Sequence, residues 1–116
     1  SMKLAIKNMS SYIKKKNQRR LIFLSDMLEL GKNSKKFHKA LSFTINKSDI
    51  NKVFVLGKHI KETFYALSFD KKGKIFKNLD EAYEYFAKNI RNNDLLMVKG
   101  SNATGLNQFS KNIKRG

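Results

Sequence analysis

Two short polar segments carry most of the side chains in this sequence that could bind a ligand. The first reads Ser-Asp-Met-Leu-Glu-Leu-Gly and supplies Asp26 and Glu29, two of only nine acidic residues in the chain. The second begins with Lys99 and Gly100 and directly follows the apolar run 95–98. The carboxylates could bind a cation or an amine, whereas the Lys99 ammonium and the backbone amides after it could bind an anion. Asp26 and Glu29 could equally cap helices or form turns, so the pattern leaves both interpretations open.

Other types of chemistry find little support in the residues. The phosphate-binding pattern GxxxxGK[ST] is absent, because Lys99 precedes its glycine. There is no Cys, and His38 and His59 lack the spacing of zinc ligands, so no disulfide and no metal site is predicted. His38 is interpreted as structural and His59 as solvated. No Ser-His-Asp set can be assembled, and no catalytic residue is predicted.

Helical and extended patterns alternate along the chain and would position these segments. Apolar residues at helical spacing predict helices at 2–16, 34–46, 58–67 and 79–90, and a last helix with Leu106, Phe109 and Ile113. Continuous apolar runs predict buried strands at 21–24, 53–56 and 95–98, and a short edge strand at 74–77 follows a turn at 70–73. Asn78, with Glu81 three residues later, predicts a capped helix start.

This alternation predicts an α/β fold, a Rossmann-like three-layer domain with a mostly parallel sheet and helices on both faces. Residues 1–116 are predicted to form one domain. Because parallel strands end at the same edge, Asp26 and Lys99 are expected to open onto one side of the molecule. The chain opens on a helix, so we expect that a first strand is missing in front of it.

The amino-acid composition indicates a folded domain rather than a disordered or membrane-spanning chain. A hydrophobic content of 41% and 9 Phe in 116 residues predict a folded domain. No apolar run approaches the roughly 20 residues of a membrane span, and no signal peptide is visible, so a cytoplasmic protein without membrane contact is predicted.

The net charge of +16 admits two interpretations. Basic proteins gain affinity for nucleic acids by releasing counterions, and a small basic α/β nucleic-acid-binding module is therefore one hypothesis. However, 21 Lys accompany only 4 Arg and 12 Asn, which favours a compositional bias over nucleic-acid recognition. The one cluster, Lys14 to Lys16 with Arg19 and Arg20, is expected at a helix end, where cations are favourable.

Three segments together resemble one family. The sequence RRLIFLSDMLELGKNSKKFH at 19–38 is similar to an arginine, strand, Gly-Asp-Met-x-Glu-Leu-Gly and His pattern of the Mur ligases. The segments KVFVLGK at 52–58 and LLMVKGSNATGLNQF at 95–109 resemble that family's next strand and its Val-Lys-Gly-Ser-Arg segment. The match departs at Ser25, where the family has Gly, and at Asn102, where it has Arg. The resemblance covers the whole chain and is closest to the ligases that add D-alanyl-D-alanine.

The resemblance implies that residues 1–116 are the C-terminal domain of a larger bacterial ligase of peptidoglycan synthesis. That enzyme joins D-alanyl-D-alanine to UDP-N-acetylmuramoyl-tripeptide, with ATP and Mg²⁺ bound mainly by its central domain. The partners of this chain would be those two substrates and the enzyme's own central and N-terminal domains, and the fragment alone is expected to bind no cofactor and to be inactive. The equivalent domain of another Mur ligase or of folylpolyglutamate synthetase is an alternative.

The resemblance also suggests roles for individual residues. Asp26 or Glu29 would orient the ammonium of the dipeptide or help to remove its proton. The carboxylate of the dipeptide would be bound by Lys99, Gly100, Ser101 and Asn102. Gly31 and His38 are candidates for the edge of this site.

Overall fold

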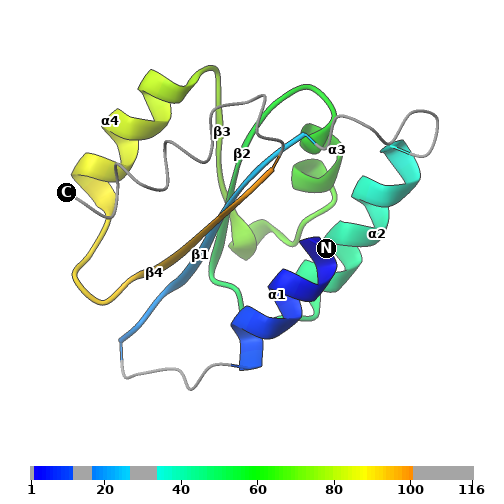
Figure 1. The fold of residues 1–116 in the computed structure, drawn as a ribbon, viewed down its shortest axis with the longest axis horizontal. Coiled ribbons are helices and arrows are strands. Elements are labelled where there is room, and N and C mark those ends of the chain that lie inside the picture. The colour runs from blue at the N-terminus through cyan, green and yellow to red at the C-terminus, as the bar shows by residue number, and fades with distance from the viewer. Residues whose placement is uncertain (1, 12–16, 27–33, 101–116) are drawn as a thin grey trace.

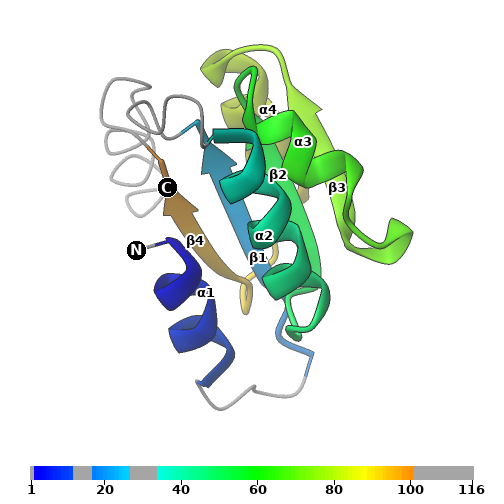
Figure 2. The same ribbon diagram turned by 90° about the vertical axis from the view of Figure 1, so that its right-hand side faces the viewer.

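The computed structural model describes residues 2–11, 17–26 and 34–100. Its elements are α1 (Met2–Ser11), β1 (Arg20–Ser25), α2 (Ser34–Asn46), β2 (Lys52–Leu56), α3 (Ile60–Tyr65), the 3₁₀ helix η2 (Phe69–Lys71), β3 (Lys72–Phe76), α4 (Leu79–Asn89) and β4 (Leu95–Lys99). The four strands form one sheet in the order β3-β2-β1-β4, and every pair is parallel. Helices α1, α2 and α3 cover one face of the sheet and α4 covers the other (Figures 1 and 2).

The predicted α/β architecture, with a parallel sheet between helices, is confirmed. β3 lies at an edge of the sheet, as expected. The segment 12–16 of the first predicted helix and all of the last predicted helix lie outside the described residues.

The core consists of two apolar layers, because successive residues of a strand point to opposite faces of the sheet. On the face of α1 to α3, Ile22, Leu24, Val53 and Val55 pack against helix residues such as Ile6, Leu41 and Ile60. On the α4 face, four buried rings dominate: Phe23, Phe54, Phe76 and Phe86. The Phe54 and Phe86 ring centroids lie 4.9 Å apart with the ring planes at 73°, a favourable edge-to-face contact. Both faces are covered, which explains the continuous apolar runs of the strands.

The predicted turn at 70–73 is wrong in one respect. Residues 69–71 form the 3₁₀ helix η2, and β3 begins at Lys72, so Gly73 lies within the strand. The β2–β3 pairing is irregular between Val53 and Phe54, and a Cβ on Gly73 would lie 2.6 Å from the Phe54 ring. The glycine therefore permits a close approach of the two strands rather than a chain reversal.

The expected helix-end position of Arg19 and Arg20 is also wrong. Arg20 is the first residue of β1, is 1% exposed, and pairs with Asp49. Arg19 bonds Asp94 with two nitrogens, at 2.9 Å from Nε and 2.5 Å from the terminal nitrogen. Both acidic partners come just before strands that flank β1, so these ion pairs close the amino-terminal edge of the sheet.

The contacts of Asp94 offset the effect of burial on the pKa of its carboxyl group. Burial alone would raise the pKa of its carboxyl group. The hydrogen bonds from Arg19 and from the Arg91 backbone amide outweigh burial and hold the pKa of Asp94 below its ordinary value. In return, the hydrogen bond to Asp94 raises the pKa of Arg19.

Helix α4 begins as predicted. The side-chain oxygen of Asn78 accepts a hydrogen bond of 2.8 Å from the Glu81 backbone amide. We expect Asn78→Ala to lower the free energy of unfolding by about 1 kcal/mol, because one amide of the first turn loses its acceptor. Urea denaturation measures the change. Asn89→Ala, at the exposed other end of α4, is the matched control and should cost less than half as much.

Candidate functional site

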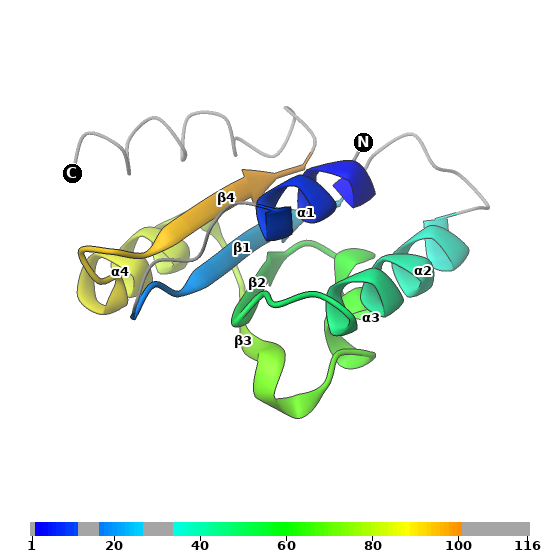
Figure 3. The ribbon, with the colours of Figure 1, turned by 90° about the horizontal axis from the view of Figure 1, so that it is seen from below.

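The candidate site lies at the carboxyl-terminal edge of the sheet, where β1 and β4 end side by side. In the parallel pairing of these strands, Leu24 lies opposite Lys99. The chain therefore leaves the sheet at Asp26 and at Gly100 from neighbouring positions. Leu95, Met97 and Lys99 are every second residue of β4 and so share one face of the sheet, the face that carries α1. The first turn of α1 lies beside the arrowhead of β4 (Figures 2 and 3).

Asp26 is held at this edge by backbone amides of the loop that follows β2. Its Oδ1 accepts hydrogen bonds from the His59 amide at 2.9 Å and from the Ile60 amide at 2.7 Å. Its Oδ2 accepts one from the Lys58 amide at 3.0 Å. His59 precedes α3 without a side-chain capping bond of its own, so Asp26 caps this short helix from another strand.

Gly57 makes this arrangement possible. Its φ of +139° is a conformation that residues with a side chain rarely adopt. A Cβ at this position would lie 2.7 Å from Oδ1 of Asp26, closer than real contacts allow. The strand end, the glycine and the carboxylate therefore form one rigid unit.

Asp26 keeps some capacity for a ligand. An ionised carboxylate offers about four lone-pair positions, and three are used by backbone amides. Among the described residues, Oδ2 accepts a single amide, so this part of the chain leaves one acceptor position on it. The side chain is half-buried, so the cap and the proposed contact with an ammonium are compatible.

Lys99 is exposed at the end of β4. Within the residues that the structure describes, no carboxylate lies within ion-pair distance of its ammonium group. Its charge at this edge is consequently not neutralised by that part of the chain. Gly100 follows it directly and is half-buried.

The two histidines differ in burial. His38 is fully buried in α2, with its ring edge-to-face against Phe37 at a centroid distance of 5.4 Å. Its backbone carbonyl accepts a 2.7 Å hydrogen bond from Thr63, which ties α2 to α3. His38 therefore lies between these helices beneath the surface of the edge, whereas His59 is exposed there.

Other predicted site residues lie outside the described part of the chain: Glu29, Gly31, Ser101 and Asn102. Within the described part, no three metal-ligating side chains gather, and no helix has the length and apolarity to cross a membrane. The backbone amides of residues 58–60, which hold Asp26, were not predicted from the sequence. The signal was a glycine after β2 followed by a short helix without a capping side chain.

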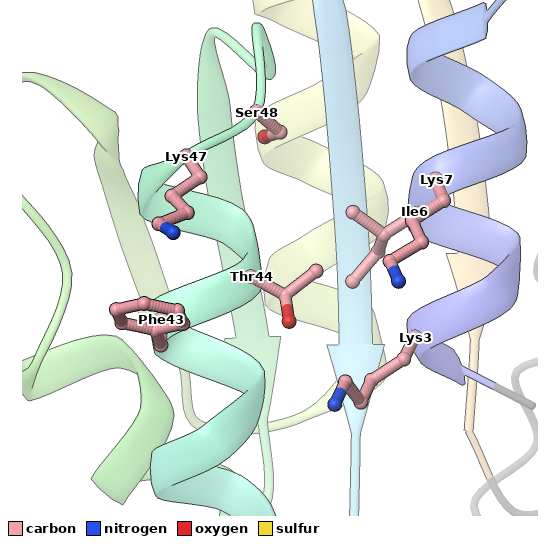
Figure 4. A pocket seen from close by; sticks show the side chains of 7 residues that line it. All are labelled: Lys3, Ile6, Lys7, Phe43, Thr44, Lys47 and Ser48. Carbon is pink, nitrogen blue, oxygen red and sulfur yellow. The ribbon is translucent and has the colours of Figure 1, made fainter.

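The surface between two of the helices, away from this edge, is also hollowed. A groove of about 440 Å³ runs between α1 and α2, with Ile6 at its base and Lys3, Lys7 and Lys47 around it (Figure 4). The Lys47 ammonium lies 4.4 Å from the centroid of the Phe43 ring and so already has a partner. The groove lies against the helices, whereas the ligands of parallel α/β sheets bind at the carboxyl ends of the strands.

Comparison with known proteins assigns the family. Residues 1–102 match the family model described as Mur ligase, glutamate ligase domain. The UDP-N-acetylmuramoyl-tripeptide–D-alanyl-D-alanine ligase of Buchnera aphidicola subsp. Baizongia pistaciae is 39% identical over 111 residues, which is 91% of this chain and 22% of that ligase. The ligase of the same name from Rickettsia prowazekii is 29% identical over 86 residues, 74% of this chain and 19% of the relative.

A solved structure shares the fold. The MurF ligase of Thermotoga maritima, in complex with ADP, superposes with a TM-score of 0.73 at 17% identity, over 95% of this chain and 24% of that one. The chain thus spans about a fifth of the length of its curated relatives. With most of its length matched by the family model, the chain belongs to the Mur ligase family, as a glutamate ligase domain.

Proposed function

We propose that residues 1–116 are the dipeptide-binding C-terminal domain of a bacterial, cytoplasmic UDP-N-acetylmuramoyl-tripeptide–D-alanyl-D-alanine ligase. The complete enzyme would join D-alanyl-D-alanine to the UDP-linked tripeptide in peptidoglycan synthesis. This domain would present the dipeptide amine to the activated tripeptide carboxylate and pack against the central and N-terminal domains. The proposal is supported by the names of the relatives and by one observation above all: Asp26 directly follows β1, and Lys99 ends the neighbouring parallel strand β4.

The proposed ligand is a zwitterion, and the edge offers one group for each pole. The Lys99 ammonium would bind the dipeptide carboxylate, together with the backbone amides of Gly100, Ser101 and Asn102. Asp26 would accept a hydrogen bond from the dipeptide ammonium through its remaining position on Oδ2. Glu29 would contribute a second carboxylate and Gly31 would border the site, with the buried His38 packed beneath it. Fixed positions for both poles would orient the amine for attack.

Within the described residues, the loop that opens α3 offers no free backbone amides to cradle a nucleotide's phosphates, because these amides already bind Asp26, and no side chains gather to bind its metal ion. We therefore propose that ATP and Mg²⁺ are bound mainly by the central domain of the complete enzyme. This chain alone would then have no ligase activity.

Removing the charge of Lys99 tests the carboxylate contact. In the complete ligase, Lys99→Gln is expected to raise the KM for D-alanyl-D-alanine about tenfold, the loss of one charge-assisted hydrogen bond. The KM for ATP should not change. Steady-state kinetics with each substrate varied in turn measures both values.

Lys88→Gln is the matched control, because Lys88 is 72% exposed on α4 and pairs with Glu84 rather than facing the candidate site. It should leave the KM for the dipeptide unchanged. A Lys99→Gln enzyme with the dipeptide KM of the unsubstituted ligase would refute the proposed contact.

A further inference from the structure

A hollow of about 400 Å³ lies at the carboxyl-terminal ends of β2 and β3, next to the candidate dipeptide site. Its apolar base is formed by Leu56, Ile75 and Phe76. Gly57 lines it on one side and touches Asp26 on the other, so the two regions are contiguous. The volume falls within the range of small-molecule sites in proteins, and the position is where parallel α/β sheets bind ligands.

Three lysines from three separate elements surround this hollow. Lys58 belongs to the loop after β2, Lys61 to α3, and Lys77 directly follows β3. Among the residues that the structure describes, no acidic side chain lines the hollow. The described part of the chain places no carboxylate within ion-pair distance of these three ammonium groups.

Lysines elsewhere on β3 and around it are engaged. Lys71 donates hydrogen bonds to the Ser48 carbonyl at 2.9 Å and the Ile50 carbonyl at 2.8 Å. Lys74 pairs with Glu81, and Lys52 donates to the Asp70 carbonyl at 2.7 Å. A general excess of lysine explains their number, but not why three line one hollow with no ion-pair partner among residues 2–11, 17–26 and 34–100.

Asp26 lies beyond ion-pair distance of all three ammonium groups. Its oxygens bond the amides of Lys58, His59 and Ile60, and this binding fixes the backbone from which the Lys58 side chain extends. Because the same bonds occupy the opening amides of α3, an anion in the hollow would have to be recognised by lysine side chains. Ammonium groups placed around a partly apolar base suit phosphate or carboxylate oxygens.

We propose that Lys58, Lys61 and Lys77 form a binding site for a small multivalent oxyanion at the β2–β3 end of the sheet. The ligand carries at least two negative charges, on phosphate or carboxylate groups. The site is distinct from the Asp26 and Lys99 positions and does not depend on the dipeptide hypothesis. Its ligand neutralises three cations that otherwise repel one another across the hollow.

The test uses the 116-residue chain at about 0.15 M salt, where diffuse surface attraction is screened. Inorganic pyrophosphate and, separately, succinate are titrated while backbone amide shifts are followed by ¹⁵N NMR. We expect saturable shifts centred on Gly57, Lys58 and Lys77. The triple variant K58Q/K61Q/K77Q should weaken pyrophosphate binding at least about tenfold, whereas K58R/K61R/K77R, which keeps the charges, should retain it.

The matched control is K35Q/K36Q/K39Q, which removes the same three charges from exposed positions of α2. It should change the Kd less than about twofold. Equal losses in the two glutamine variants would mean that net charge alone attracts the anion, and would overturn the site. If neither pyrophosphate nor succinate binds saturably to the unsubstituted chain, the proposed site is also overturned. Binding of pyrophosphate alone identifies a phosphate site, and binding of both probes identifies a general oxyanion site.

Discussion

Asp94→Ala is expected to lower the free energy of unfolding by about 3 kcal/mol, the low end of the range for removing one member of a buried ion pair, because the Arg19 side chain is 26% exposed. The Asp94 side chain is 1% exposed and accepts two hydrogen bonds from Arg19 and one from the Arg91 amide. Arg19 also bonds the Asn89 carbonyl at the end of α4. Loss of the carboxylate thus loosens the connection between β1, α4 and the start of β4. Urea denaturation at pH 7 measures the change.

Glu84→Ala provides the comparison, because it also removes an acidic partner from an ion pair. Glu84 and Lys88 are 71% and 72% exposed, and their contact of 3.2 Å lies within one helix. Exposed pairs of this kind contribute about 0.5 kcal/mol or less. If the two substitutions cost the same, the stabilising role of the Arg19–Asp94 pair is wrong.

The contribution of Asp94 depends on pH in a defined direction. Its pKa is lower in the folded chain than in the unfolded chain, where it is about 3.9. The unfolded state therefore binds the proton first, and the stabilisation is complete above the unfolded pKa. It is lost as the pH falls through the folded pKa. The difference in stability between the unsubstituted chain and Asp94→Ala should accordingly stay constant from pH 7 to about pH 5 and shrink below about pH 4.

The layered fold could be predicted because its signals are local. Each strand is a short apolar run, and helix spacing marks the helices between, so the element order follows from the sequence alone. The same reasoning failed where a residue's partner is distant in the chain. In the sequence, Arg19 and Arg20 extend a basic run that predicts a helix end, yet their partners Asp94 and Asp49 lie 75 and 29 residues away. The segment 70–73 has the composition of a turn, but Gly73 lies within β3, where the Phe54 ring of the neighbouring strand leaves no room for a side chain.

The candidate site shows the same division. That Asp26 and Lys99 share one edge could be predicted, because parallel strands end together. The strand order, which makes β1 and β4 direct neighbours, is set by packing between distant segments. The backbone amides that bind Asp26 come from residues 58–60, and no local pattern around Asp26 identifies them. The sequence therefore suggested the residues of the edge, while the structure adds that Asp26 is a cap with one acceptor position that no described residue occupies.

Gly57→Ala should be comparably severe, with an expected loss of about 3 kcal/mol in the free energy of unfolding. Two costs add: an L-residue at φ +139° is strained, and its Cβ would lie 2.7 Å from Oδ1 of Asp26. The carboxylate cannot move aside freely, because three amides hold it. The comparison is Asp26→Ala, which removes the obstructing carboxylate. It should cost about 2 kcal/mol, because the amides of residues 58–60 lose their acceptor.

A double-mutant cycle separates the two costs of Gly57→Ala. In the Asp26→Ala background the new Cβ meets no carboxylate, so only the backbone strain remains. The double variant should therefore be more stable than the sum of the single changes predicts, by about 1 kcal/mol. Additivity within about 0.3 kcal/mol would show that Gly57 and Asp26 do not constrain each other. In that case the rigid unit on which both the proposed ammonium contact and the fixed position of Lys58 depend would not exist.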